Sequence, residues 1–152
     1  MQPNGQITRA EATTIFFRLL TEESRSANLT KTNGYTDVAS DAWYNTAVST
    51  MTKAGIVDGY PDGTFGPQRS ITRAETATMI NRVLDRVPSE ESHLLSRGVM
   101  QIWPDANPGD WFYLAMQEAT NSHDYERNAK WAAADEQWTA LRETRDWKAL
   151  EQ

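Results

Sequence analysis

Apolar residues recur at helical spacing in two stretches of the chain that begin alike. Residues 8–20 and 72–87 each place apolar side chains three and four positions apart, which predicts two amphipathic helices. Each opens with Thr-x-x-Glu, at 8–11 and at 72–75. This is the spacing of a capping box, in which the two residues satisfy each other's free backbone N–H groups. Pro88 is expected to end the second helix.

A third apolar set at helical spacing follows Trp43, and a similar set follows Trp111. The two sets comprise Ala47, Val48, Met51 and Ala54, and then Ala115, Met116 and Ala119. Gly55 should end the first of these helices, because glycine readily takes the left-handed position after a helix. The tail predicts one more helix, with an apolar face made of Trp131, Ala134, Trp138 and Leu141.

Polar and glycine-containing segments separate the predicted helices. Pro61-Asp62-Gly63 predicts a tight turn, since proline presets one backbone angle and glycine accepts a positive φ. Two very short extended pieces, 56–57 and 64–65, are expected to flank it. Residues 21–34 are predicted to form a polar linker.

Two elements of the chain occur twice. Ile-Thr-Arg-Ala-Glu stands at 7–11 and at 71–75, 64 residues apart. Asp37 and Trp43 recur 68 residues later as Asp105 and Trp111, in segments of similar pattern. Identical peptides at such a distance indicate a protein built from repeats.

The order of these elements divides the chain into whole and partial repeats. The predicted division is the end of a truncated repeat (1–20), a linker (21–34), a complete repeat (35–87), a linker (88–102), the start of a degenerate repeat (103–123) and a divergent tail (124–152) that forms a helical cap. The first residues suggest a cut inside a longer protein, and no signal peptide is visible.

Composition narrows the possible functions. The net charge of −6 argues against a general nucleic-acid binder, which normally carries a basic face. There is no cysteine, so disulfides and thiolate chemistry are excluded. No apolar run approaches the roughly 20 residues that cross a bilayer, so membrane insertion is not expected.

The sequence nominates no metal, cofactor or catalytic residue. The segment 58–69 resembles a calcium loop only in part, because Arg69 stands where the bidentate glutamate should be. His93 and His123 are expected to be isolated from any ligand cluster. No nucleophile elbow, phosphate loop or dinucleotide fingerprint is present.

Arg9 and Arg73 are the unexplained residues of the duplicated peptide. A cation in the first turn of a helix opposes the macrodipole, by roughly 0.3–1 kcal/mol. Two explanations remain open: contact with an anionic ligand, which suits the guanidinium fork, or a salt bridge to a neighbouring repeat's aspartate.

Taken together, these motifs resemble the S-layer homology module, a repeat that anchors bacterial surface proteins to the cell wall. The residues that carry the resemblance are Tyr35-Thr-Asp37-Val38, Asp41-Ala-Trp43-Tyr44, Ala54-Gly-Ile-Val-Asp-Gly59, Asp62-Gly-Thr-Phe65 and Ile71-Thr-Arg-Ala-Glu75. Weaker matches extend it over roughly residues 3–123. The resemblance implies a mainly α fold in which helical repeats pack with pseudo-threefold symmetry.

The resemblance also implies a function without catalysis: binding of an anionic, often pyruvylated, secondary wall polysaccharide at a Gram-positive-type cell surface. Carried over by position, the ligand-binding residues are Asp37, Trp43, Gly59 and Arg73, then Arg9, Asp105 and Trp111. Each aspartate could instead brace an arginine, and each tryptophan could pack in the core. A module for assembly with partners or with itself through the incomplete repeats is one alternative function, and a fragment of a wall-active hydrolase is another.

Overall fold

The computed structural model describes residues 5–86, 88–127, 136–143 and 149, and the chain divides into two compact units, Met1–Val83 and Leu84–Gln152. The fold is mainly α, as the sequence predicts. The pseudo-threefold packing stays a prediction. Among the described residues, no helix combines the length and the apolar character needed to cross a membrane.

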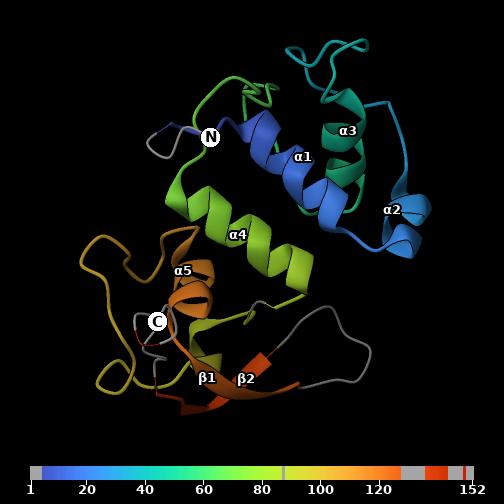
Figure 1. Ribbon diagram of the computed structural model, residues 1–152. Helices are drawn as coiled ribbons and strands as arrows, with labels where there is room; N and C mark the ends of the chain where they lie inside the picture. The colour runs from blue at the N-terminus through green and yellow to red at the C-terminus, as the bar shows by residue number, and fades with distance from the viewer. Residues whose placement is uncertain (1–4, 87, 128–135, 144–148, 150–152) are drawn as a thin grey trace. The chain divides into compact units, whose positions relative to one another are not determined.

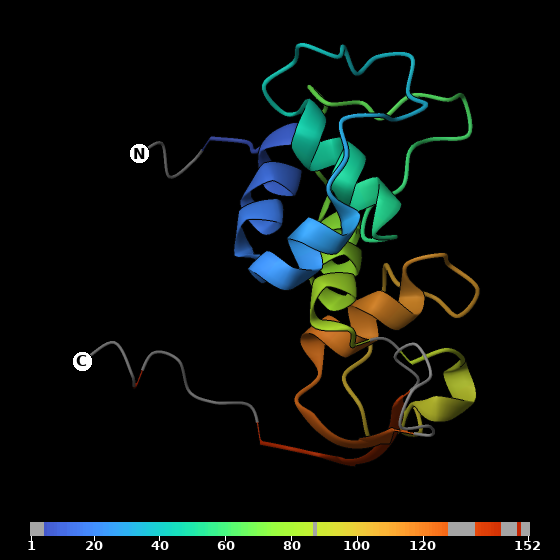
Figure 2. The same cartoon turned by 90° about the vertical axis from the view of Figure 1, so that its right-hand side faces the viewer.

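The first unit is built from helices. They are α1 (Arg9–Leu19), α2 (Glu22–Asn28), α3 (Asn45–Lys53) and α4 (Arg73–Leu84), the last residue of which begins the second unit. Helix α1 lies beside α3, and α2 packs against α3 (Figures 1 and 2). Their common core includes Val48, Met51 and Phe65, none of which reaches solvent.

Both predicted capping boxes form. The Thr8 hydroxyl accepts the backbone N–H of Glu11 at 3.2 Å, and the Glu11 carboxylate accepts that of Thr8 at 2.8 Å. Thr72 and Glu75 make the same two bonds at 3.2 and 2.8 Å. Helix α4 nevertheless ends at Leu84, three residues before its predicted end. Asp85 takes a left-handed conformation (φ 53°), so the chain turns before Pro88 is reached.

The end of α3 follows the sequence prediction. Gly55 adopts φ 71°, and the N–H groups of Gly55 and Ile56 bond to the carbonyls of Thr52 and Met51 at 3.0 and 2.9 Å. This is the Schellman arrangement that glycine favours. Residues 21–34, in contrast, are more than a linker, because they contain α2. Thr21 caps that helix by accepting the N–H of Ser24.

The two copies of the repeated peptide lie side by side. Thr8 and Ser70 form an isolated antiparallel bridge, and the N–H of Ile71 donates to the carbonyl of Ile7 at 3.1 Å. The first N–H groups of α1, which have no partner within a helix, donate to carbonyls of the second copy's approach segment. Arg9 N bonds to Arg69 O at 2.8 Å. The start of one repeat helix is thereby capped by the other repeat.

The turn at 61–63 forms as predicted, and its neighbour Gly59 packs tightly. Gly63 takes φ 81°, while neither 56–57 nor 64–65 becomes a strand. A Cβ on Gly59 would lie 2.2 Å from the ring of Tyr35 and 2.8 Å from the Thr64 carbonyl oxygen. Glycine is therefore required here so that an aromatic ring can lie against the backbone.

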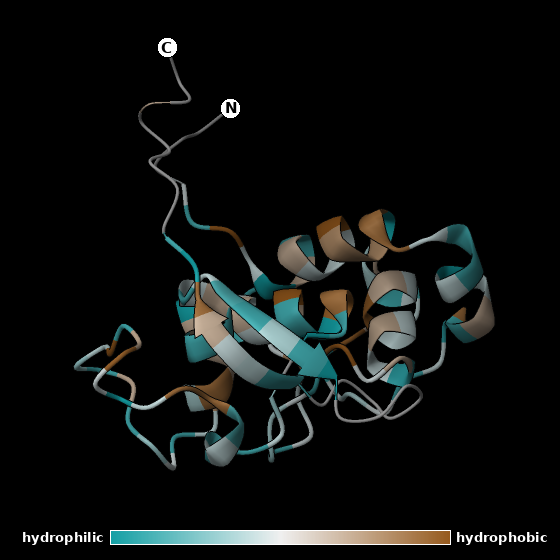
Figure 3. Ribbon diagram, turned by 90° about the horizontal axis from the view of Figure 1, so that it is seen from below, coloured by the Kyte–Doolittle hydropathy of each residue, from teal (hydrophilic) through white to brown (hydrophobic). Residues whose placement is uncertain are grey.

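The described residues of the second unit form one α-helix and a small sheet. The unit contains a short 3-10 turn, η1 (Glu91–His93), helix α5 (Tyr113–Thr120), and the antiparallel strands β1 (His123–Arg127) and β2 (Glu136–Leu141). Figure 3 shows the polar colour of β1. Leu94, Met100, Tyr113 and Trp138 are among its core residues.

The tail therefore differs from its predicted helical cap. Trp138 and Leu141 lie in β2, while Trp131 and Ala134 fall outside the described residues. The two apolar residues are three positions apart, a spacing that a short strand can also contain. Burial in β2 begins as an alternation, with Glu136 and Trp138 buried and Gln137 half-buried. Pairing with β1 satisfies backbone groups that a helix would have satisfied internally.

We expect Gly59→Ala to lower the free energy of unfolding by about 1–3 kcal/mol, because the new methyl group overlaps the Tyr35 ring and a backbone oxygen. Chemical denaturation followed by tryptophan fluorescence measures this. Gly34→Ala is the matched control, since nothing lies within 4 Å of its Cβ position. Equal stabilities of the two variants would contradict the packing role of Gly59.

Candidate functional site

The two arginines of the repeated peptide have different environments. The Arg9 side chain is only 7% exposed. Its Nε donates to the Phe65 carbonyl at 2.9 Å, and its two terminal nitrogens donate to the Asp58 carbonyl at 2.9 Å and to Glu75 Oε1 at 2.6 Å. Arg9 thus forms the salt bridge left open by the sequence, with a glutamate in place of the expected aspartate. Its contact with a ligand stays a prediction.

Glu75 collects several of the bonds in this network. Besides Arg9, it accepts the Tyr60 hydroxyl at 2.8 Å and the Thr72 N–H. Burial on its own raises the pKa of Glu75, but the bonds from Thr72 and Tyr60 and the charge of Arg9 outweigh it, and the net pKa is lowered. The same glutamate therefore caps α4 and holds a buried cation of the other repeat.

Arg73 is exposed, and its side chain forms no ion pair or hydrogen bond with any residue that the structure describes. It stands at the same position of its motif as Arg9. Arg73 is consequently the arginine of the pair that an anionic ligand can reach without displacing a protein partner.

Asp37 bonds to the backbone of the glycine-rich loop, residues 58–66. Its carboxylate oxygens accept the N–H groups of Phe65 and Gly66 at 2.7 and 2.8 Å. The aspartate thus braces the loop that holds Arg9, without touching Arg9 itself. Asp105, its counterpart in the second unit, is exposed and has no hydrogen-bond partner in the described part of the chain. Ligand contact by either aspartate stays a prediction.

Trp43 is a predicted site residue that lines a groove in the first unit. Its side chain is 65% exposed, with its indole edge-on to Tyr44 at 5.3 Å between ring centroids. Trp43 and α1 enclose an open groove of about 420 Å³, which we call the α1 groove. Its lining consists of Gly5, Gln6, Ile7, Glu11, Thr14, Ile15, Arg18 and Trp43. Gly59, Arg9 and Arg73 do not belong to it.

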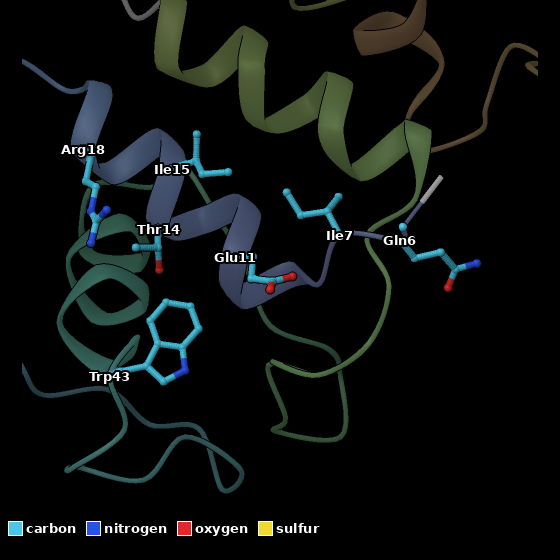
Figure 4. A pocket seen from close by; sticks show the side chains of 8 residues that line it. Gln6, Ile7, Glu11, Thr14, Ile15, Arg18 and Trp43 are labelled. Carbon is cyan, nitrogen blue, oxygen red and sulfur yellow. The ribbon is translucent and has the colours of Figure 1, made fainter. Parts of the chain in front are cut away.

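The polar side chains of the α1 groove come from successive turns of one helix. Glu11, Thr14 and Arg18 are three and four residues apart, so they lie on one helical face. Figure 4 shows Thr14 and Arg18 pointing to the side of α1 on which the Trp43 indole lies. The groove therefore offers an aromatic face, a hydroxyl, a carboxylate and a guanidinium within one open space.

Arg18 is the site residue that the sequence analysis missed. The repeat spacing of 64 residues aligns it with Arg82. Arg82 forms an ion pair with Asp58 at 2.6 Å, whereas the Arg18 side chain forms no ion pair or hydrogen bond with residues 5–86. Comparison of the two repeat helices would have located the position, but only the fold reveals that it remains unpaired.

Trp111 repeats the local geometry of Trp43 in the second unit. It is 69% exposed and edge-on to Phe112 at 5.4 Å, with an interplanar angle of 84° against 83° for Trp43 and Tyr44. A second equivalence supports this one. Trp103 donates to the Thr120 hydroxyl as Tyr35 bonds to that of Thr52. The segment predicted as a degenerate repeat thus reproduces two side-chain contacts of residues 35–52.

Comparisons with known proteins agree on one family. Residues 34–77 match the S-layer homology domain. The chain is 32% identical over 130 residues to Cell surface glycoprotein 1 of Acetivibrio thermocellus, covering 82% of this chain and 5% of that protein. It is 40% identical over 86 residues to the Cellulosome-anchoring protein of the same organism, covering 57% of this chain and 19% of that protein.

A third relative is the Middle cell wall protein of Brevibacillus brevis, 37% identical over 100 residues. That match covers 66% of this chain and 9% of the relative. The chain therefore spans a small part of the length of the curated relatives it matches. No solved structure matches it significantly.

We expect Arg9→Ala to destabilise the first unit by about 3–5 kcal/mol, because it removes one partner of a buried ion pair and leaves two backbone carbonyls without their donor. Thermal or denaturant unfolding measures this. Arg73→Ala, the same change in the other copy, should alter stability by no more than about 0.5 kcal/mol. A similar loss in both variants would contradict the difference between the two sites.

Acid should weaken the same network. The folded-state pKa of Glu75 is below its ordinary value of 4.5, so its contribution to stability is present above that pH and is lost as the pH falls through the folded-state pKa. We expect the free energy of unfolding to fall less steeply below pH 4.5 in Glu75→Gln than in the wild type. Denaturant titrations between pH 3 and 6 measure the two slopes. Identical slopes would exclude Glu75 as a source of acid sensitivity.

Proposed function

Because this chain belongs to the S-layer homology family, we propose that it anchors a bacterial surface protein to the cell wall by binding an anionic secondary wall polysaccharide, for example a pyruvylated one. The names of the relatives support a place at the cell surface and in the cell wall. Binding of this kind makes and breaks no covalent bond.

The α1 groove is the observation that carries the proposal. An exposed indole is a flat apolar surface on which the C–H face of a sugar ring can stack, and its edge-on contact with Tyr44 holds its orientation. The open shape of the groove suits a polymer that continues beyond the bound residues. Within the described residues the Trp43 side chain stays 65% exposed, so its face is open to a ligand.

The polar groups beside Trp43 match the other features of such a sugar. Thr14 and Glu11 can bond to hydroxyl groups, and Arg18 can bind a carboxylate through two parallel N–H bonds. Because the chain carries a net charge of −6, an anionic polymer requires a locally placed cation of this kind. Arg18 is exposed and can bind without losing an ion pair.

The remaining predicted residues receive supporting roles in this proposal. Arg73 offers a second free cation on the repeat surface, and Trp111 with Asp105 offers a second exposed aromatic and acidic pair. Asp37 and Gly59 shape the loop between the repeats. The degenerate repeat lacks a Thr-Arg-Ala-Glu peptide, so we propose fewer working sites than three.

Assembly with a protein partner is a second candidate function. Ile15 and Leu19 are exposed on α1, where apolar side chains normally face a neighbouring element. Sedimentation at several protein concentrations, with and without wall polysaccharide, separates the two ideas. Association that grows with protein concentration and ignores the polysaccharide would favour assembly. The hydrolase alternative predicts turnover of peptidoglycan.

We expect Trp43→Ala and Arg18→Gln each to weaken binding of purified wall polysaccharide roughly tenfold or more, since each removes a central contact. Isothermal titration calorimetry measures this, with circular dichroism to verify the fold. Removal of the pyruvate groups should reduce the effect of Arg18→Gln and preserve that of Trp43→Ala.

Matched controls are available for both changes. Arg25→Gln alters an arginine of α2 that lies over the Phe17 ring, and it should leave the affinity unchanged. Trp111→Ala tests the equivalent exposed indole of the second unit. Wild-type affinity in both Trp43→Ala and Arg18→Gln would exclude the α1 groove as the binding site.

A further inference from the structure

The second unit contains a buried cluster of ionisable side chains that the proposed function does not use. Glu118, His123 and Glu136 come from α5, β1 and β2, and their side chains are 4%, 3% and 0% exposed. One ligand atom from each lies within 4.8 Å of the other two. The expectation that His123 stands apart from any ligand cluster is therefore wrong.

The imidazole of His123 is oriented as in many metal sites. Its Nδ1 lies 2.7 Å from the carbonyl oxygen of Asn121, which can only accept, so Nδ1 carries the proton. Nε2 of the neutral ring then has a lone pair, which at present faces Arg86 Nη2 at 3.0 Å, and Nε2 lies 3.2 Å from Glu118 Oε2. A histidine that donates its other ring N–H to a backbone carbonyl is the usual arrangement for a metal ligand. Stacking on Trp138, at 3.8 Å between centroids, holds the ring in place.

Glu136 supplies an independent sign of a missing partner. Its Oε1 accepts Arg86 Nε at 2.6 Å, while its Oε2 is buried and has no hydrogen-bond partner among the described residues. Leaving a buried acceptor unpaired destabilises a fold, and more so when the acceptor is charged. A carboxylate oxygen in this condition is suited to a cation.

The guanidinium of Arg86 supplies the positive charge that faces these three side chains. Its Nη2 lies 2.9 Å from Glu118 Oε1 and 3.0 Å from His123 Nε2, so the guanidinium is close to all three residues. Two carboxylates and one guanidinium leave a net charge of −1 beside a neutral imidazole. Arg86 is 27% exposed and lies over the Tyr125 ring at 3.9 Å, so its charged end has a path to solvent.

We propose that Glu118, His123 and Glu136 form a binding site for a divalent transition metal of the Zn²⁺ class, which displaces the guanidinium of Arg86. One imidazole nitrogen and two carboxylate oxygens suit zinc, with water at the fourth position. Two ligands about 2.1 Å from a tetrahedral metal lie about 3.4 Å apart, close to the 3.2 Å between His123 and Glu118. A divalent ion also balances the two buried carboxylates. Ca²⁺ and Mg²⁺ prefer oxygen ligands alone and should not compete.

The site is tested with the whole chain, dialysed against chelator and titrated with ZnCl₂ by isothermal titration calorimetry. We expect one Zn²⁺ per chain, a higher melting temperature with Zn²⁺, and no effect of CaCl₂ at equal concentration. Glu136→Gln and His123→Gln should each weaken binding at least tenfold. His93→Gln is the matched control, because it removes the chain's other imidazole, and it should retain wild-type affinity.

Arg86→Gln distinguishes a metal site from an ion-pair cluster that needs its arginine. Without the competing guanidinium, a metal site should bind Zn²⁺ more tightly, and Zn²⁺ should restore the melting temperature lost by the substitution. The proposal is overturned if neither the wild type nor Arg86→Gln binds Zn²⁺, or if His93→Gln abolishes binding. Where Arg86→Gln does not fold, wild-type titration against Glu136→Gln decides the question.

Discussion

The buried ion pair between Arg9 and Glu75 is the interaction on which the first unit depends. One guanidinium joins the start of α1 to the start of α4 and to the carbonyls of the glycine-rich loop between them. Its partner carboxylate also completes a capping box. A charge in this buried position is tolerated only because every nitrogen of the guanidinium has an acceptor. The loop, two helices and the pairing of the repeated peptides are thus interdependent.

This arrangement gives identical peptides different tasks. Arg9 is enclosed because its guanidinium bonds to the carbonyls of the glycine-rich loop and to Glu75. Arg73, in contrast, is exposed. The same reasoning applies to α1 and α4, since Arg82 is paired with Asp58 and the aligned Arg18 is unpaired. We propose that the unpaired copies, Arg73 and Arg18, are the charged groups that an anionic ligand reaches.

The second unit keeps the first half of the repeat and replaces the rest. Trp111 and Trp103 reproduce contacts made by Trp43 and Tyr35, while a hairpin stands where a loop and a capped helix would follow. Beside its hydrophobic core, this unit buries a group of two carboxylates, an imidazole and a guanidinium.

The sequence by itself determined the repeat, both capping boxes, the helix end at Gly55 and the turn at Gly63, because each depends on residues a few positions apart. It also indicated the family and named Trp43 and Trp111 as candidate residues, but only the tertiary structure showed that both side chains are exposed. Tertiary structure decided that Arg9 is buried and Arg73 exposed, and that α2 occupies a segment predicted as linker. It likewise decided that the tail forms β2 and brings three ionisable residues together. Burial and long-range pairing depend on which distant segments meet, and local periodicity carries no record of those partners.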